Sequence, residues 1–418
     1  MFFEIKSWHC LRYIMAINKA YKYEIVPSKR QLVLLYKHVG TARFVYNWGL
    51  DRSINEYKDT GKTIQGYDLI NEMSKLKKTK EYKWMYEVSA NTIQSSLLNL
   101  EKAYKNFFRR IKQGQKAGFP KFKKKGVSKD SFTMNCNLKI ISNKKIQLPK
   151  MGKIRTKENT SKFKGKILNA SVSREANRWF VSFNVKVEQK EYINNSKDIV
   201  GIDLGLTTFA TLSNGSKIIA PKPLKKQLYR LARKQKQHSK KVIGSNNRKK
   251  SSLRLARLHR KIRNKRLDFI HKITTKLAKT KQVIVIEDLN VKGMVKNHKL
   301  ARHISDAGWS IFRKQLEYKS NWYNSKVIVA DRFYASSKIC SVCGNKKDKL
   351  KLNERVYICD KCSIEIDRDI NAAINLKRLY TEKPSGIYAC GDESSGSLKL
   401  MNETIVNEAG IKSLKRRF

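Results

Sequence analysis

The chain has 418 residues, of which 91 are lysine or arginine and 34 are aspartate or glutamate, giving a formal net charge of +57. A charge of that size repels itself unless a polyanion offsets it, so nucleic acid is the expected partner. No apolar run approaches the length of a transmembrane helix, and no membrane partner is expected. Charged side chains interrupt the first 15 residues, which makes them a poor signal peptide. We therefore expect a cytoplasmic protein that acts on the nucleoid.

The N-terminal part predicts a strand followed by a long helix. Residues 18–26 favour a strand, and helical periodicity begins near Gln31. Within residues 43–48 aromatic side chains alternate with Arg43 and Asn47, a combination suited to stacking on bases and contacting phosphates. Burial of the aromatic residues in a helical core explains them at least as well. Both interpretations can hold on opposite faces of one helix.

Residues 66–112 are predicted to be helical. Glycine and proline then end the helix in a lysine-rich loop that contains Lys121 and Lys123. Short alternating runs follow at 131–134, 138–141, 145–148, 167–172 and 179–187. Many short strands separated by turns predict a small antiparallel barrel or sandwich.

Residues 225–281 form a very basic stretch with a single acid, Asp268. Apolar residues recur in it at three-, four- and seven-residue steps, which predicts one long helix with a dense positive face. A solvated charged face is the usual explanation of such a run. Here acids are too rare for i,i+4 pairing, so contact with a nucleic-acid backbone is the better interpretation. Its candidate contacts are Arg254, Arg257 and Lys261.

Three further strand-like runs contain or precede a carboxylate. They are 199–205, 283–286 and 326–330, and a predicted helix at 304–320 separates the last two. The carboxylates are Asp203, Glu287, Asp288 and Asp331. Alternating strands and helices with an acid at each strand end predict an α/β fold with a site at one sheet edge.

Four of the seven cysteines form two Cys-x-x-Cys pairs, Cys340 with Cys343 and Cys359 with Cys362. Two such knuckles joined by a hairpin predict a zinc ribbon. Four protein ligands leave no open position on the ion, so the zinc is expected to be structural. The cysteines at 10, 136 and 390 have no partners in this pattern, and an odd, scattered set argues against a disulfide framework.

A third carboxylate follows the ribbon. Asp369 begins a predicted helix. Ala372, Ala373 and Leu376 follow it by three, four and seven residues and so lie on the same side of that helix as Asp369. Small residues let that helix lie close against a sheet, which brings Asp369 over the strand ends. Asp203, Glu287 and Asp369 can then hold two divalent ions about 3.5–4 Å apart, and Mg²⁺ suits such ligands. The alternative is that each acid is a local cap or a surface group.

At this point the sequence resembles TnpB, the transposon-encoded RNA-guided nuclease family related to type V CRISPR effectors. The resemblance covers about Met15 to Ser395. The segments that carry it lie at 21–27, 41–47, 118–123, 200–205, 286–289, 336–338 and 367–373. It implies that Asp203, Glu287 and Asp369 are metal ligands, and it selects Glu287 over Asp288 and Asp369 over Asp367. Strand alternation, which aims neighbours at opposite faces, agrees with the choice of Glu287.

The resemblance also implies a fold and its domains. The fold is a RuvC-like (RNase H-like) nuclease with an inserted zinc ribbon, a β-barrel wedge domain and a helical recognition lobe. The implied boundaries are 15–30 with 114–190 for the wedge domain, 31–113 for the recognition lobe, 197–335 with 366–380 for the nuclease, and 336–365 for the ribbon. Residues 1–14 precede the usual start of the family, so they are an extra segment or the true start is Met15. Residues 381–418 are expected to form a flexible tail.

The function implied by the resemblance is RNA-guided, Mg²⁺-dependent cleavage of DNA by a protein of an insertion sequence. The expected partners are a guide RNA from the transposon end and double-stranded target DNA, bound by a protein monomer. One alternative is a catalytically silent RNA-guided repressor, which would be expected to lack part of the carboxylate set. Others are a transposase that joins strands, and a zinc-ribbon nucleic-acid-binding protein without catalysis. The last leaves the three carboxylates unexplained.

Overall fold

The computed structural model describes residues 14–161, 165–190, 192, 194–351, 353–382 and 389–390. The predicted extra segment, Cys10 and most of the predicted tail lie outside these residues. The chain divides into two compact units. Unit 1 holds residues up to 192 together with 221–268, and unit 2 holds 193–220 together with the chain from 269 onward. None of the described helices is both long enough and apolar enough to cross a membrane.

Unit 1 is built on an antiparallel sheet of seven strands in the order β2-β6-β7-β1-β5-β4-β3. The strands are β1 Ile14–Val26, β2 Ser131–Met134, β3 Lys139–Ser142, β4 Lys145–Leu148, β5 Gly152–Thr156, β6 Lys166–Glu175 and β7 Arg178–Lys190. The predicted closed barrel is not confirmed, because the edge strands β2 and β3 do not pair with each other among the described residues. Instead, long β1 and β7 pair over twelve residues and form the centre of an open sheet.

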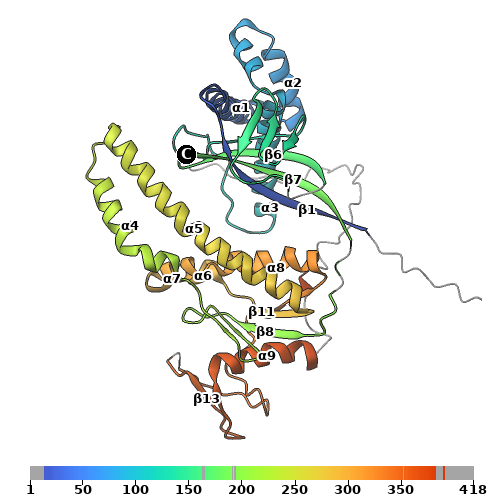
Figure 1. Ribbon diagram of the computed structural model, residues 1–418, viewed down its shortest axis with the longest axis vertical. Coiled ribbons are helices and arrows are strands. Elements are labelled where there is room, and N and C mark those ends of the chain that lie inside the picture. Colours follow the sequence, from blue (N-terminus) through green and yellow to red (C-terminus); the bar gives the residue numbers. More distant parts are fainter. Residues whose placement is uncertain are drawn as a thin grey trace, which may run out of the picture. The chain divides into compact units, whose positions relative to one another are not determined.

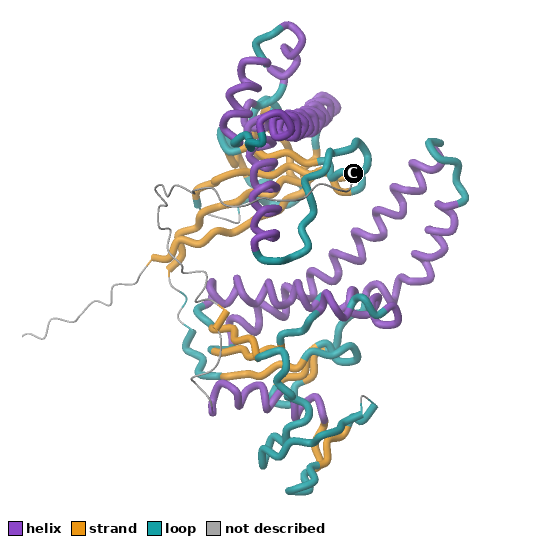
Figure 2. Tube along the Cα trace, turned by 180° about the vertical axis from the view of Figure 1, so that it is seen from behind, coloured by secondary structure: helices purple, strands orange, loops and turns teal. Residues whose placement is uncertain are grey.

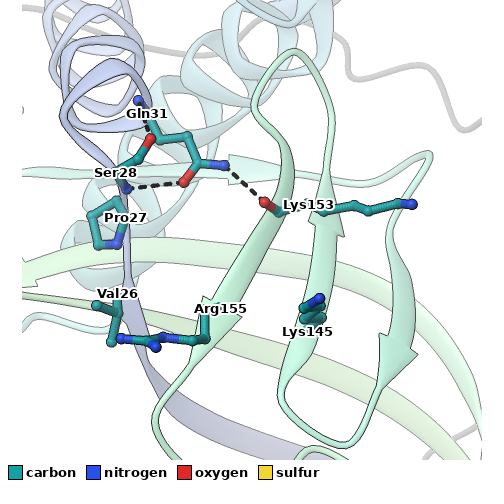
Figure 3. Close-up of a pocket in the computed structure, with 7 residues that line it drawn as sticks. All are labelled: Val26, Pro27, Ser28, Gln31, Lys145, Lys153 and Arg155. Carbon is teal, nitrogen blue, oxygen red and sulfur yellow. Dashed lines mark hydrogen bonds between the residues drawn. The ribbon is translucent and has the colours of Figure 1, made fainter.

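Helix α1 (Lys29–Thr60) is attached to this sheet at its first turn, as Figure 3 shows. Ser28 and Gln31 form a capping box, in which each side chain accepts a hydrogen bond from the other's backbone N–H. The Gln31 amide also donates to the carbonyl oxygens of Met151 (3.1 Å) and Lys153 (2.8 Å). One glutamine therefore fixes both the start of the helix and its position against β5.

The other helices of this region pack on α1. They are α2 Gly66–Leu76, the 3₁₀ helix η1 Lys80–Glu87 and α3 Ala90–Lys112. Their core contains Val45, Leu50, Met85 and Leu97, all fully buried. The predicted helical stretch 66–112 is thus three helices, which the short segments 77–79 and 88–89 interrupt. Figures 1 and 2 show these helices beside the seven-stranded sheet.

The basic stretch predicted as one helix is two helices, α4 Pro223–Ser239 and α5 Asn246–Thr280. Gly244 in the connection has a φ of +86°, a left-handed conformation that a continuous α-helix does not contain. The predicted apolar stripe lies in α5, where Leu258 and Ile262 pack against Leu231 of α4. A helical hairpin therefore replaces the single predicted helix.

Unit 2 contains a six-stranded sheet in the order β10-β9-β8-β11-β12-β15. Its strands are β8 Ile199–Asp203, β9 Ala210–Leu212, β10 Lys217–Ile218, β11 Val283–Glu287, β12 Lys326–Ala330 and β15 Ala389–Cys390. The central strands β8, β11 and β12 are parallel, so their carboxyl ends lie at one edge. The mixed α/β architecture predicted for this part of the chain is confirmed.

Helices cover both faces of this sheet (Figure 1). The helices connecting β11 to β12 are α6 Val291–Met294, α7 His298–Ala307 and α8 Trp309–Tyr323. On one face Ile202 and Ile286 pack against Phe312 of α8. On the other, Val283 and Val285 pack against Leu376 of α9 (Arg368–Glu382). The hairpin of β13 (Val356–Ile358) and β14 (Glu365–Asp367) leads directly into α9.

Candidate functional site

Asp203 and Glu287 lie side by side at the carboxyl edge of the parallel strands. Ile202 of β8 pairs with Ile286 of β11, so the next residues along the two strands are these carboxylates. Side chains alternate along a strand, which places both acids on the face opposite Ile202 and Ile286. That is the face covered by α9, whose first turn carries Asp369.

Helix α9 lies against β8 at an unusually short distance because Gly201 has no side chain. A Cβ atom at this position would lie 2.0 Å from the carbonyl oxygen of Ala373 and 2.5 Å from the amide nitrogen of Lys377. Ala372 and Ala373 are buried at the same contact. The predicted close packing of this helix by small residues is confirmed, and it brings Asp369 to the sheet edge.

Replacing Gly201 with alanine is expected to displace α9 and strongly reduce any activity of the carboxylate site. The new methyl group would overlap backbone atoms, which cannot rotate away as a side chain can. We expect a loss of unfolding free energy of about 1–3 kcal/mol, typical of an overpacked core. Thermal unfolding and DNA cleavage measure the two effects. Gly40→Ala in α1, where a Cβ meets no atom within 4 Å and φ is not left-handed, is the control for an added methyl group without a clash.

The electrostatics of the three acids show that they interact. Burial, together with the charges of the nearby Glu287 and Asp369, raises the pKa of Asp203 to about 8, while Arg368 acts in the opposite direction. Burial also raises the pKa of Glu287, although a hydrogen bond from Ser336 Oγ (2.6 Å) favours its ionised form. Three carboxylates in such surroundings are stable as anions when a cation lies between them.

The acids next to these three have partners of their own. Asp288 forms ion pairs with Arg313 and Arg332. Asp367 pairs with Lys217 (2.7 Å) and accepts hydrogen bonds from the first-turn amides of α9, which makes it the cap of that helix. Asp331 accepts the amide hydrogen of Phe333 at 2.7 Å. Arginine or lysine side chains therefore already pair with Asp288 and Asp367, and a backbone amide donates to Asp331.

The four predicted zinc ligands lie together. The sulfur atoms of Cys340, Cys343, Cys359 and Cys362 are all within 4.8 Å of one another. Sγ–Sγ distances of 3.5 and 3.6 Å are too long for a disulfide and close to the edge, about 3.8 Å, of a tetrahedron with 2.3 Å Zn–S bonds. Among the described residues no group of three carboxylates is gathered this tightly. The cysteine cluster fits zinc, as the sequence predicts.

Two asparagines of α9 hold the first cysteine knuckle. Asn371 accepts from the Ser341 amide (2.8 Å) and donates to the Ile339 carbonyl (2.7 Å), and it is fully buried. Asn375 donates to the carbonyls of Ser336 (2.8 Å) and Ile339 (2.6 Å). Because the Ser336 hydroxyl donates to Glu287, the ribbon, α9 and the carboxylate edge form one hydrogen-bonded assembly. Sequence analysis missed this role. Its signal was a pair of asparagines four residues apart, which places both amide groups on the same face of a helix.

Three family profiles match successive parts of the chain. A helix-turn-helix domain matches residues 15–62, a family described as "Probable transposase" matches 182–298, and a Cas12f1-like TNB domain matches 309–376. The last segment contains the four cysteines and Asp369. The residues that these profiles match lie in both compact units of the fold.

Full-length relatives decide the family. A protein of Streptomyces pristinaespiralis named "Putative RNA-guided DNA endonuclease" is 36% identical over 380 residues, which are 90% of this chain and 92% of the relative. The protein named "Putative RNA-guided DNA endonuclease InsQ" from Escherichia coli K12 is 32% identical, with 92% of this chain and 97% of the relative covered. The chain belongs to this family, the TnpB family.

A solved structure shares the fold of this TnpB-family chain. The Cas12f1 protein in its complex with guide RNA and target DNA superposes with a TM-score of 0.51. The match covers 87% of this chain and 99% of that one at 14% identity. At that identity the likeness concerns the fold alone.

Several of the predicted nucleic-acid contacts of the TnpB-family chain have intramolecular partners. Arg43 pairs with Asp130 (3.2 Å). The Asn47 side chain forms two hydrogen bonds with the backbone of Lys123, whose ammonium lies 3.6 Å from the centre of the Tyr46 ring. These contacts attach the lysine-rich loop to α1. The exposed candidates are Lys121, Arg254, Arg257 and Lys261, and Arg257 also contacts Asn177 (3.0 Å).

Sequence analysis missed a basic pocket at the start of α1. The pocket has a volume of about 450 Å³, and Lys145, Lys153 and Arg155 line it without any carboxylate (Figure 3). Lys145 lies directly opposite Arg155 on the paired strands β4 and β5. Like charges in that position destabilise a sheet, so their presence favours an anionic partner. Lys153, Arg155 and Lys157, which alternate with a period of two along β5 and just after it, were the available signal.

Changing Arg155 to glutamate is expected to stabilise the free protein and at the same time to weaken its binding to RNA. It replaces a like-charge pair with an attractive one, so the protein without nucleic acid should become more stable by about 0.2–1 kcal/mol. RNA affinity should fall, and the slope of log affinity against log salt should become shallower by about 1. Lys349→Glu on the ribbon loop makes the same charge change and is the control. Equal losses of RNA affinity in both variants would contradict a specific role for the pocket.

Proposed function

We propose that the chain is an RNA-guided, Mg²⁺-dependent DNA endonuclease encoded by an insertion sequence. One observation carries the proposal. Asp203, Glu287 and Asp369, from two parallel strands and the first turn of α9, interact at one sheet edge, while the neighbouring Asp288 and Asp367 are paired with arginine or lysine. Membership of the TnpB family and relatives named as RNA-guided DNA endonucleases support it.

The residues of the site have separate tasks in this proposal. Asp203, Glu287 and Asp369 would hold Mg²⁺ through hard oxygen ligands. When bound, the ions supply a nucleophilic water and stabilise the leaving oxygen of the phosphodiester. Ser336 fixes the orientation of the Glu287 carboxylate, and Asp367 fixes the start of α9 and thereby Asp369. Hydrolysis proceeds without a covalent enzyme intermediate.

The rest of the chain would bind the nucleic acids. In the proposed arrangement residues 15–30 and 114–190 form the wedge domain and 31–113 the recognition lobe. The nuclease comprises 197–335 and 366–380, with the zinc ribbon at 336–365. A guide RNA from the transposon end selects double-stranded target DNA by base pairing, and a protein monomer recognises a short motif beside the target. The basic pocket beside α1 adds a surface for the RNA backbone.

The decisive experiment expresses the full chain together with the DNA that flanks its gene. RNA that copurifies with the protein is sequenced, and the complex is then incubated in Mg²⁺ with duplex DNA that matches the guide. We expect one RNA species from the flank of the gene and cutting of the matched duplex only. Random cellular RNA, or equal cutting of matched and mismatched DNA, would contradict the proposal.

The same experiment separates the alternatives. A silent repressor would retain its guide RNA and bind matched DNA without cutting it in Mg²⁺. A transposase would produce joined strands, which a gel of labelled DNA distinguishes from hydrolysed ends. A zinc-ribbon protein without catalysis would show neither product.

A further inference from the structure

The tip of the hairpin formed by α4 and α5 (Figure 1) exposes two adjacent aliphatic side chains. Val242 is 76% exposed and Ile243 is 85% exposed, and both lie in the connection between the two helices. We refer to these two residues as the aliphatic pair. Exposed aliphatic residues that are scattered singly are ordinary, whereas neighbours at the end of a structured hairpin are suited to contact with a partner.

Hydrogen bonds hold the tip of the hairpin in one shape. The Ser245 hydroxyl accepts from the Arg248 amide (3.1 Å), as an N-cap does, and donates to the carbonyl oxygen of Val242 (2.9 Å). The Arg248 guanidinium donates to the carbonyl oxygens of Lys241 (2.7 Å) and His238 (3.4 Å), at the end of α4. These contacts join the two helices across their connection. The aliphatic pair is therefore presented to solvent from a pre-organised support.

The hairpin is anchored at a distance from its tip. Arg257 of α5 donates to the side chain of Asn177 (3.0 Å), and Arg260 donates to the carbonyl oxygen of Glu175 (3.2 Å), both in or beside the turn between β6 and β7. From Arg257 back to the first residue of α5 the helix extends about 17 Å, at about 1.5 Å per residue. None of residues 232–254 is buried. This half of the hairpin is therefore an arm exposed to solvent.

The arm is uniformly positive. Residues 232–254 contain nine lysines and arginines and no acid. Such a surface attracts a polyanion and repels a second copy of itself. A lipid surface fits less well, because two aliphatic side chains bury much less apolar area than one acyl chain, which by itself anchors a protein only weakly. An apolar tip with basic flanks is typical of proteins that insert a side chain between stacked base pairs.

We propose that the aliphatic pair inserts between base pairs of the target DNA duplex and opens it locally. The inference rests on the proposed function, which requires the two DNA strands to separate before the guide can pair. Guide pairing replaces one duplex with another of similar stability, so a small contribution to opening changes how fast pairing begins. Double-stranded RNA is a poorer partner, because side chains cannot enter its deep, narrow major groove.

The chemistry of the tip also determines what it cannot do. Aliphatic side chains neither donate nor accept hydrogen bonds, so the pair does not distinguish one base edge from another by hydrogen bonding. Lys240 and Lys241, which directly precede the pair, carry the charge that phosphates attract. Opening by this tip is therefore largely independent of sequence, and the guide alone selects the target.

The test compares intact DNA with DNA that is already open. The full chain with its guide RNA is mixed in Mg²⁺ with matched duplexes that are fully paired, or whose non-target strand is mismatched over the guided segment. A variant with both Val242→Ser and Ile243→Ser should cut paired DNA about tenfold more slowly than the wild type, because it no longer offsets the cost of unstacking. It should cut the open DNA at the wild-type rate. Its RNA content and thermal unfolding should not change.

A second measurement follows opening without cleavage. DNA carrying 2-aminopurine in the guided segment is mixed with the complex in the absence of Mg²⁺, and the rise in fluorescence reports unstacking. The double variant should show a rise about tenfold slower than the wild type, in step with its cleavage of paired DNA. Ile219→Ser is the matched control, because Ile219 is also exposed (73%) but lies outside the hairpin, and it should behave as the wild type does.

The outcomes separate this inference from the proposed function. Equal opening of paired DNA by the wild type and the double variant would overturn the inference alone. So would an equal loss on paired and open DNA, which would indicate an ordinary binding contact. Unchanged opening together with lost binding to phosphatidylglycerol vesicles would assign the tip to a lipid surface. A complex that opens matched DNA but never cuts it would contradict the proposed nuclease and leave the inference standing.

Discussion

Replacing Asp203 with asparagine is expected to abolish guided DNA cleavage while RNA binding stays unchanged. Asparagine keeps the shape of the side chain but removes its charge, so the site loses a ligand for the ions. The rate should fall at least 10²–10³-fold, the usual cost of one electrostatic group in a transition state. The variant should also unfold at a higher temperature in the absence of metal, because burial and the two neighbouring acids make an ionised carboxylate at this position unfavourable, and asparagine carries no charge. Single-turnover cleavage, retained RNA and thermal unfolding measure these effects.

Asp331→Asn is the matched control. Asp331 follows β12, the third parallel strand, but it is exposed and accepts a backbone hydrogen bond. Its change should leave cleavage close to the wild-type rate. If Asp203→Asn cut guided DNA at the normal rate, the assignment of the metal site would be wrong. If it lost RNA binding and stability together, Asp203 would have a structural role instead.

Replacing Cys340 with serine is expected to release zinc, unfold the ribbon and slow cleavage, although the zinc takes no part in the reaction. A structural zinc site contributes about 10–16 kcal/mol of binding free energy, so three ligands cannot keep the knuckles folded as four do. The effect should reach the carboxylates, because the same knuckle contacts Asn371 and Asn375 and continues to Ser336 and Glu287. Metal analysis and hydrogen exchange over residues 336–378 measure the loss independently of activity.

Cys136→Ser is the control for the loss of a thiol. Cys136 is exposed and lies outside the cysteine cluster, where it contacts the Asn91 amide at 3.2 Å. Its change should alter stability by no more than about 0.5 kcal/mol and leave one zinc ion per chain. A Cys340→Ser protein with a full zinc content and unchanged exchange over the ribbon would refute the proposed site.

The parts of the fold that the sequence predicts well are those with local signals. The cysteine knuckles depend on a spacing of three residues, and all four sulfurs meet as expected. The buried strands β8 and β11 are short apolar runs with clear ends. The family resemblance selects Glu287 over Asp288, and strand alternation agrees with that choice. The helix face of α9 that carries small apolar side chains can likewise be recognised from the sequence of residues 372–376. Each of these features is determined by residues that are neighbours in the chain.

The features that were missed depend on distant partners. Whether seven antiparallel strands close into a barrel is decided by the pairing of β2 with β3, and no local pattern contains that information. The interruption between α4 and α5 had a signal in Gly244, but the apolar stripe of α5 concealed it. The hydrogen bonds of Asn371 and Asn375 reach residues 30 or more positions away. Such roles appear only when the structure brings the segments together.

Helix α9 lies near the C-terminal end of the described chain, so Asp369 is the last of the three carboxylates to be synthesised. The ribosome releases the seven-stranded sheet first, then β8, α4, α5 and β11 in turn, and α9 only after the ribbon. A growing chain therefore presents its basic surfaces long before Asp369 reaches the other two carboxylates. A nascent or truncated product that ends before residue 368 lacks Asp369 and cannot complete the carboxylate site. If the protein cuts DNA as proposed, its carboxylate site becomes complete only at the end of translation, after the segments proposed to bind the guide RNA have been made.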